Sequence, residues 1–505
     1  MNKSTKILLV ALFVASIAIR LAIAFQTSHL EYEGYGVARQ IESIRETGLP
    51  LYNDDLSYGG RDRVFSPVYY YLLAGFSFFM PIELVAKIIP NLLASTLVFA
   101  IFFLSMQVSK NEKVSLLASG FAAFIPGFFN NTINNASIYS AVIPLFFLTA
   151  HYFLLANKDP RHVYKLIICI VILTVLHPTS LILALSLLVY IAFLKLQRFR
   201  ESSREPEIVL FFLFLVFWLN TVLYKRALSV HGAGALLQNI PSRIVEESYT
   251  QITILESIYN IGLLPLIFGL GAVYVSFFGK KRKHVTLMAS ISLTIFLLLW
   301  FRFFELTTGL MLLGITLAAL SAYFMNYIYE HLKTVKIRQA HNIFLIALLA
   351  IAVIGTAPNV FVASAQAGQV PSSEDIKMYS WLASNTEENS TLLVLPEEGS
   401  AMSYFSNRKN VMDEDYLLVP NINRRHSDII SIYKERFVTS ALQKLNYYSV
   451  DYVLLTEYNY EDNNISTLPF FDDNCIRQVY PEEQDSNEEF TPKAFEVRCV
   501  LGIPD

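Results

Sequence analysis

Long apolar runs recur from the first residues of this chain to about residue 358, and they constrain its fold more than any other feature. Each run is roughly 18 to 22 residues long, which is the length that a helix needs to cross a bilayer. Of the 505 residues, 54% are hydrophobic and only 16% are charged, so one water-soluble core could not hold this much apolar surface. The sequence therefore predicts a polytopic α-helical membrane protein with about 11 transmembrane helices. They are centred near Ala15, Leu97, Phe121, Phe147, Val171, Leu187, Leu215, Phe268, Phe296, Leu317 and Ala350.

The basic residues of the short loops predict the orientation of these helices. With a cytoplasmic N terminus, nearly all Lys and Arg clusters fall on the cytoplasmic side, among them Lys110 with Lys113 and the run 280–283, as the positive-inside rule requires. The pair Lys225 and Arg226 is the exception. The stretch 68–80 is too short to span, so we assign it to a surface helix in the first external loop, residues 26–86. We expect a multi-pass protein of the cell membrane with its C-terminal domain outside.

The composition changes after Pro358, where charged residues and Asn become frequent. We therefore divide the chain into a membrane domain, residues 1–358, and a C-terminal extracytoplasmic α/β domain, residues 359–505. Short apolar runs at 390–399, 407–415 and 450–458 predict strands, and the spacing at 432–446 predicts a helix. Cys475 and Cys499 both lie in this domain, where an oxidising exterior would permit a disulfide; two buried free thiols are the alternative.

The first external loop brings an unusual amount of charge to the membrane edge. An amphipathic helix is predicted before the stop signal of Gly48 and Pro50, with Val37, Ile41 and Ile44 on its apolar side. Its polar side is predicted to carry Arg39, Gln40, Glu42, Arg45 and Glu46. Glu31 and Glu33 lie at or just before its first turn, where free backbone N–H groups stabilise a carboxylate. Such a group can bind a divalent cation such as Mg²⁺ or Mn²⁺, or accept a proton from a nucleophile; helix capping is the alternative.

The order of segments in the first 150 residues resembles a known family. An acidic residue opens an amphipathic helix that ends in "TGLPLY", and "FSPVYYYLLAGF" and "AKIIPNLLAS" follow. This order is similar to that of the integral-membrane glycosyltransferases of superfamily C, which include protein O-mannosyltransferases, the aminoarabinose transferase and the catalytic subunit of oligosaccharyltransferase. The resemblance implies transfer of a sugar from a polyprenyl phosphate carrier, with the essential acid in the first external loop. Glu33 matches that position best, although the family more often has Asp there, and Glu31 is the reserve.

Two motifs of the oligosaccharyltransferases are missing from this sequence. The turn "PGFFNNTINNASIYS" has amides where those enzymes have a second acidic motif, and neutral amides are weaker metal ligands than carboxylates. A "WWDYG" signature is also absent, and "LPEEGSAMSYFSNRKNVMDED" occupies the comparable place. We therefore expect neither a tightly held metal nor transfer of an oligosaccharide to asparagine.

Several other charged residues are candidates for the site. Arg302, at the outer end of a predicted span, could hold the donor phosphate in its fork of N–H groups; snorkelling or an ion pair with Glu305 would also explain it. Arg61 and Arg63 are weaker phosphate candidates. His177, Asp54 and Asp55 could line the same cavity, and His177 could equally make a helix-end hydrogen bond.

These features together predict an enzyme that transfers a sugar, with inversion, from a polyprenyl-phosphate-linked donor to a lipid, glycan or protein acceptor. A secondary transporter is the main alternative, but transporters usually place their charged sites near the bilayer midplane. A non-catalytic membrane scaffold is the third. The net charge of −3 and the absence of a basic surface make nucleic acid an unlikely partner.

Overall fold

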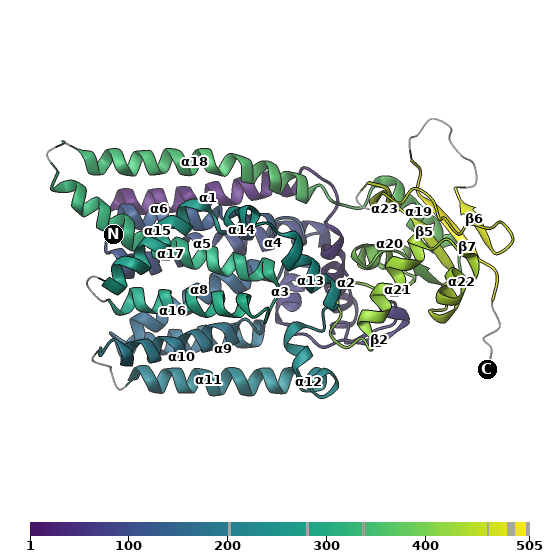
Figure 1. Ribbon diagram of the computed structural model, residues 1–505, viewed down its shortest axis with the longest axis horizontal. Coiled ribbons are helices and arrows are strands. Elements are labelled where there is room, and N and C mark those ends of the chain that lie inside the picture. Colours follow the sequence, from purple (N-terminus) through teal and green to yellow (C-terminus); the bar gives the residue numbers. More distant parts are fainter. Residues whose placement is uncertain are drawn as a thin grey trace.

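The computed structural model describes residues 1–199, 204–278, 282–335, 337, 339–461, 464–481 and 490–500. Long helices lie side by side in a bundle, and a smaller domain of strands and helices covers one end of it (Figure 1). The N terminus lies at the opposite end of the bundle. Short helices and loops occupy the space between the bundle and the smaller domain, and the candidate site lies among them.

The bundle is built from the apolar runs of the sequence. Its long helices are α1 (Lys3–Ala24), α4 (Ile82–Ser95), α5 (Leu97–Ser109), α6 (Glu112–Ala123), α8 (Tyr139–Ala156), α9 (Val163–Leu176), α10 (Ser180–Leu196), α11 (Arg204–Leu223), α15 (Leu263–Phe278), α16 (Lys283–Trp300), α17 (Leu306–Lys333) and α18 (Ala340–Ala367). Its shorter elements are α7 (Pro126–Asn130), η2 (Pro160–His162), α12 (Lys225–His231), η3 (Gly232–Leu237), α13 (Ser242–Gln251) and α14 (Ile254–Ile261).

Seven helices of the described chain are long and apolar enough to cross a bilayer, with α4 and α5 together forming one of them. The count becomes eight if α14 and α15, which meet at an angle of 81°, form one broken span. That bend falls at Gly262, whose φ of 88° is readily adopted only by glycine. The centres of all eleven predicted runs lie in helices, but α6, α9 and α10 have only 12, 14 and 17 residues. The chain is thus a multi-pass membrane protein, and the count of eleven spans is not confirmed.

Polar contacts join several loops at the end of the bundle farthest from the smaller domain. The backbone N–H of Asn2 donates to Glu112 at 3.1 Å, and Lys158 Nζ donates to Gln107 at 2.6 Å. Lys283 forms an ion pair with Glu205 at 2.9 Å. Arg226, the basic exception in the sequence, instead pairs with Asp62 of the first loop. This distribution agrees with the pattern on which the predicted orientation rests, while the orientation itself stays a prediction.

The first loop contains the predicted amphipathic helix, α2 (Tyr32–Thr47), which ends at Gly48 in the left-handed conformation. Ile41 and Ile44 are buried as expected, but Arg39 and Gln40 are buried too, at 7% and 1% exposure. Their predicted exposure was wrong because the rest of the loop folds over them: Gln40 accepts a hydrogen bond from the backbone of Leu51, and Arg39 binds Asp54.

The remaining elements of this loop are short. They are β1 (Asn53–Asp54), η1 (Ser57–Gly59), β2 (Arg61–Asp62) and α3 (Val68–Ser77). With ten residues, α3 is too short to span a bilayer, in agreement with its predicted place in the loop. The buried Tyr69 of α3 donates its hydroxyl to the carbonyl of Ala136 at 2.9 Å, which ties the loop to the turn before α8.

The C-terminal domain has a five-stranded mixed sheet with strand order β4-β3-β5-β7-β6. Strands β4, β3 and β5 run parallel, and β7 pairs antiparallel with both β5 and β6. The strands are β3 (Thr391–Leu393), β4 (Lys409–Asn410), β5 (Tyr452–Leu455), β6 (Ile476–Tyr480) and β7 (Lys493–Val497). The helices are α19 (Ser373–Asn385), η4 (Pro396–Glu398), α20 (Gly399–Ser406), α21 (Ile422–Lys434), α22 (Val438–Tyr447) and α23 (Glu457–Glu461). Each predicted strand segment therefore holds a strand.

Helices cover both faces of this sheet because neighbouring residues of a strand point to opposite faces. Leu392 belongs to a core that includes Tyr379 of α19 and Met402 of α20. Leu393, the next residue, belongs to a second core with Ile429 of α21 and Leu442 of α22. The α/β domain that the sequence predicts therefore has three layers, with the sheet between two layers of helices.

Two boundaries in this part of the chain differ from the prediction. The helix predicted at 432–446 is broken at Glu435, whose backbone is extended and whose carboxylate accepts hydrogen bonds from Ser440 and Lys444 of the following helix. The predicted domain boundary at Pro358 falls inside α18, which continues to Ala367. Ala363 and Ala367 pack in an apolar cluster with Ile23, and this packing extends the helix.

The two cysteines of the α/β domain, Cys475 and Cys499, are joined by a disulfide, which is the first of the two alternatives given by the sequence.

Candidate active site between the helix bundle and the α/β domain

Glu33 lies in the first turn of α2 and faces the turn that precedes α8. Asn135 Nδ2 donates to Glu33 Oε2 at 3.5 Å, and the backbone N–H of Glu31 donates to the carbonyl of Asn134 at 3.3 Å. The Asn-rich turn noted in the sequence thus lies directly against the predicted acid. It contributes amide groups to the site and no carboxylate.

The two predicted acids have different environments. The Glu33 side chain is exposed at the surface. The surrounding protein still displaces enough water to raise the pKa of Glu33 to about 6, and the charge of Glu305 contributes to this rise. The hydrogen bond from Asn135 opposes it. Burial raises the pKa of Glu31 to about 8, with a smaller contribution from the charge of Glu33. Near pH 7 Glu33 is therefore mostly ionised, whereas Glu31 is mostly protonated.

Three further carboxylates come close enough to Glu33 to interact with its charge or with each other. Glu305 precedes the first turn of α17 and accepts a hydrogen bond from Thr308 at 3.0 Å. Glu397 and Glu414 come from the α/β domain, and burial, followed by the charges of Glu33 and Glu397, raises the pKa of Glu414 well above its usual value. We call Glu33, Glu305, Glu397 and Glu414 the acidic cluster.

Aromatic residues border the acidic cluster on the bundle side. Tyr139, at the start of α8, is close enough to feel the charges of Glu305 and Glu33. The ring of His177 lies edge-on to that of Tyr139, with centroids 5.2 Å apart. His177 also forms a hydrogen bond with Thr179. Tyr139 therefore lies between His177, predicted as a cavity residue, and the acidic cluster. The bond to Thr179 is the helix-end hydrogen bond given above as the alternative role of His177.

Arg302 lies in the loop between α16 and α17, together with Glu305. Its guanidinium lies over the ring of Tyr249 at 5.2 Å, and Tyr249 donates its hydroxyl to the carbonyl of Phe304 at 2.8 Å. The side chain is exposed, and among the described residues no ion pair joins it to Glu305 or to another carboxylate. Stacking on Tyr249 orients the guanidinium while its N–H groups stay accessible.

The other two predicted phosphate-binding residues are already engaged with carboxylates. Arg63 pairs with Asp54 at 3.0 Å and with Asp415 at 2.8 Å. Arg61 pairs with Asp413 at 3.0 Å and with Asp415 at 3.4 Å. These bonds join the first loop to the α/β domain, an arrangement that favours docking over phosphate binding. Asp54, predicted as a cavity residue, belongs to this network, and Asp55 is exposed beside it.

The docking network also determines where one member of the acidic cluster lies. Glu414 is flanked in the chain by Asp413 and Asp415, whose carboxylates are held by the arginines of the first loop. Ser57 Oγ donates to Asp413 Oδ2 at 2.6 Å, and the Tyr58 hydroxyl donates to the Asp413 carbonyl at 2.6 Å. Because the same loop carries Glu33, these contacts fix Glu414 relative to Glu33.

Only weak signals in the sequence indicate these additional site residues. From the sequence, Glu305 is expected only as a partner for Arg302, and Glu397 and Glu414 lie in the segment that replaces the missing "WWDYG" signature. The acidic groups "PEE" and "DED" within that segment could have been singled out. Nothing local in the sequence indicates that Glu414 lies near Glu33, because more than 350 residues separate the two along the chain.

No protein-family model and no curated protein matches the sequence, but solved structures do. The apo form of the Archaeoglobus fulgidus oligosaccharyltransferase gives a TM-score of 0.69 at 14% identity, over 90% of this chain and 70% of that chain. AglB from the same organism, in complex with an inhibitory peptide and a dolichol-phosphate, gives 0.67 at 14% identity over 91% and 70%. ArnT from Cupriavidus metallidurans, bound to undecaprenyl phosphate, gives 0.55 at 10% identity over 98% and 99%.

This chain has the fold of the superfamily C glycosyltransferases. The resemblance noted in the first 150 residues thus extends, at the level of fold, over nearly the whole length of the chain. In this superfamily C fold the acidic cluster lies where the helix bundle, the first loop and the α/β domain meet.

The acidic cluster is a poor resident metal site. Among the described residues, no three His, Cys, Asp or Glu side chains are grouped so that they could hold one ion. Glu33 and Glu305 could supply two carboxylate oxygens, and a cation with a preference for six oxygen ligands would need the remainder from substrate or water. The archaeal oligosaccharyltransferase has also been solved in complex with Zn and sulfate.

Proposed function

We propose that this protein is a membrane glycosyltransferase that moves a sugar from a polyprenyl-phosphate-linked donor to a hydroxyl group of an acceptor. The observation that carries the proposal is the state of Glu33: an accessible carboxylate with a pKa of about 6 at the junction of bundle and domain. A general base works best when its pKa lies near the operating pH. The superfamily C fold adds support, because the neighbours AglB and ArnT were solved with polyprenyl phosphates.

Glu33 accepts the proton of the acceptor hydroxyl in this proposal. The hydroxyl oxygen forms a bond to the anomeric carbon while the bond from that carbon to the phosphate oxygen breaks. The polyprenyl phosphate leaves with the electron pair. Attack from the face opposite the phosphate would invert the anomeric centre.

Arg302 stabilises the departing phosphate. Its side chain is accessible, and stacking on Tyr249 holds it in the loop that also carries Glu305. A guanidinium offers parallel N–H groups that match two phosphate oxygens. We assign Arg61 and Arg63 to docking, because their guanidinium groups already bind carboxylates.

A divalent cation is compatible with this site without being required by it. Glu33 would provide one ligand and Glu305 a second, and the cation would supply charge to neutralise the donor phosphate. Glu33 as base and Arg302 as phosphate ligand do not depend on a bound cation.

The orientation and setting of the reaction also belong to the proposal. The acidic cluster and the α/β domain would face the extracytoplasmic side, since the opposite end of the bundle carries most basic loop clusters. The acceptor would be a lipid, glycan or protein hydroxyl at that face. A transporter would instead be expected to place its charged residues near the middle of the spans, whereas the acidic cluster lies beyond the ends of α8 and α17.

The test is Glu33→Gln, compared with Glu31→Gln. Purified protein in proteoliposomes would be given decaprenyl phosphate carrying mannose, glucose or arabinose, together with total lipid and glycan extracts as acceptors, and release of decaprenyl phosphate would be measured. We expect Glu33→Gln to slow release at least about 100-fold, because a general base contributes about 100- to 10,000-fold. Glu31→Gln should change it little, since Gln resembles the protonated acid already present near pH 7.

The outcomes separate the choice of acid from the class of protein. Loss of activity in Glu31→Gln alone would mean that the wrong acid was chosen. Full activity in both variants would exclude the proposed base. Uptake of a solute into the vesicles without release of decaprenyl phosphate would favour the transporter.

A further inference from the structure

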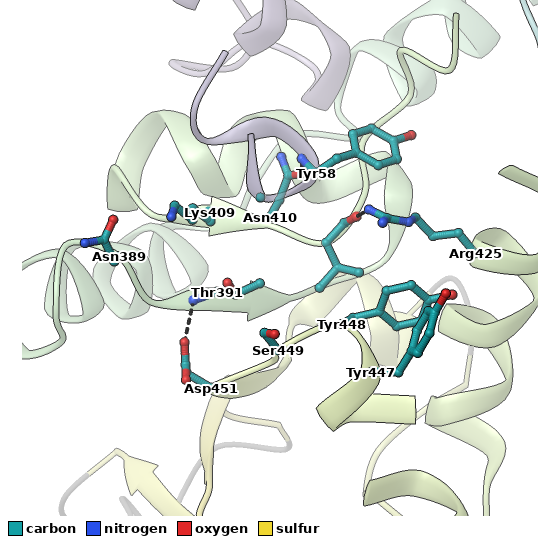
Figure 2. Close-up of a pocket in the computed structure, with 12 residues that line it drawn as sticks. Tyr58, Asn389, Thr391, Lys409, Asn410, Arg425, Tyr447, Tyr448, Ser449 and Asp451 are labelled. Atoms are coloured by element: carbon teal, nitrogen blue, oxygen red, sulfur yellow. Dashed lines mark hydrogen bonds between the residues drawn. The ribbon is translucent and has the colours of Figure 1, made fainter. Parts of the chain in front are cut away.

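The α/β domain contains a polar cavity, separate from the acidic cluster, with a volume of about 490 Å³. Its walls come from the ends of β3 and β4, from the turn after α22, and from Tyr58 and Gly59 of the first loop (Figure 2). Cavities of about 300 to 1,000 Å³ are typical of small-molecule sites. No lining residue belongs to a helix of the bundle.

Two cationic side chains face this cavity, and no ion pair neutralises either within the described part of the chain. Arg425 lies between two aromatic rings, 5.3 Å from the centroid of Tyr58 and 5.0 Å from that of Tyr448. Its Nη1 donates to the carbonyl of Val411 at 3.0 Å. The guanidinium is therefore fixed in one orientation, with its remaining N–H groups available to a ligand. Lys409 lies on the other side of the cavity in Figure 2.

The rest of the lining is polar and aromatic. Tyr447 is 60% exposed at the rim, where its ring lies edge-on to that of Tyr448 with centroids 4.9 Å apart and also contacts the Arg424 guanidinium. Asn389 and Ser449 are exposed and offer an amide and a hydroxyl. The carboxylate of Asp451 accepts the backbone N–H of Thr391 at 2.8 Å, which occupies one of its oxygens. The lining thus has one partly engaged anion and two unpaired cations.

We propose that this cavity binds a carbohydrate that carries carboxylate groups. The fixed guanidinium of Arg425 and the ammonium of Lys409 match a carboxylate, the exposed ring of Tyr447 offers an apolar face to a sugar ring, and the amide and hydroxyl groups match sugar hydroxyls. A phosphate ion alone would use the cations but not the aromatic rim. A lipid headgroup is disfavoured because the bundle contributes nothing to the lining.

The site has a structural consequence for the first loop. Tyr58 and Gly59 belong to η1, which the docking network attaches to the α/β domain, and Arg425 stacks on Tyr58. A bound sugar would contact both the loop and the domain, and it would stabilise their association. The inference concerns binding alone and does not rest on the proposed transferase activity.

Calorimetric titration of the full-length protein in nanodiscs tests this inference, with trigalacturonate as the probe. Maltotriose, a neutral trisaccharide, and inorganic phosphate are the ligand controls. We expect saturable binding of trigalacturonate, with maltotriose at least about tenfold weaker. Lys409→Met and Arg425→Lys should each weaken it at least about tenfold, because hydrogen bonds to charged groups carry about that much affinity.

Two further variants complete the design. Lys434→Met removes an exposed cation of α21 outside this cavity and should leave the affinity unchanged. Tyr447→Ala should weaken trigalacturonate but not phosphate, which separates a carbohydrate site from a simple anion site. The inference is overturned by absent saturable binding, by equal affinity for maltotriose, by insensitivity to both cavity cations, or by phosphate displacing trigalacturonate at equal affinity.

Discussion

Replacement of Asp415 by Asn tests the contact that holds the first loop on the α/β domain. Asp415 receives bonds from Arg63 at 2.8 Å and from Arg61 at 3.4 Å. Burial by itself would raise the pKa of Asp415, but the charges of the two arginines outweigh it and lower the pKa from 3.8 to about 2. The ionised carboxylate is therefore stabilised in the folded protein.

The size of the effect follows from this shift. One pKa unit corresponds to about 1.4 kcal/mol. Because 32% of the Asp415 side chain is exposed, water screens part of this interaction. We therefore expect the variant to lose about 1 to 2 kcal/mol of the free energy that docks the loop on the α/β domain. The stabilisation is fully present above the unfolded pKa and is lost as the pH falls through about 2. At pH 7 the variant should show the whole loss.

Hydrogen exchange in residues 53–63 is the appropriate measurement, since these residues form the docked part of the loop. A loss of about 1 to 2 kcal/mol should speed their exchange roughly 5- to 30-fold. Asp55→Asn is the matched control, because Asp55 is an exposed carboxylate of the same loop. Equal protection in the Asp415 variant and native protein would refute the view that this network docks the loop. Normal transferase activity despite faster exchange would show that the reaction does not depend on docking of the loop by this network.

Two other predictions follow from the site and from the distribution of charge. If ionised Glu33 is the base, its pKa of about 6 predicts a transfer rate that is level above pH 6 and falls about tenfold for each pH unit below it. Initial rates measured between about pH 4.5 and 8 would show this profile, and a rate that stays level down to about pH 5 would contradict it. If the α/β domain is extracytoplasmic, an impermeant maleimide applied to intact cells should label Asp473→Cys but not Lys113→Cys, and the opposite pattern would reverse the orientation.

Local sequence patterns were sufficient to predict the main elements of this protein. The apolar runs predicted the helices of the bundle because the length of a spanning helix depends on bilayer thickness. The position of α2 followed from its periodicity and from Gly48, and the three strand segments followed from short apolar runs. The choice of Glu33 as the candidate acid came from the family resemblance, which rests on the local stretch of sequence that opens α2. Breaks such as the one at Glu435 were missed, because its carboxylate is held by Ser440 and Lys444, contacts that helical periodicity does not reveal.

The composition of the site was decided only by the tertiary structure. Arg61 and Arg63 resembled free phosphate ligands in the sequence because their partners, Asp413 and Asp415, lie about 350 residues away in another domain. The same long-range contacts bring Glu414 to Glu33, and packing removes water from Glu31 so that the two neighbouring acids acquire different pKa values. The sequence determines which groups carry charge; their partners and their access to water depend on how distant segments pack, and these decide which charges are neutralised and which are available for chemistry.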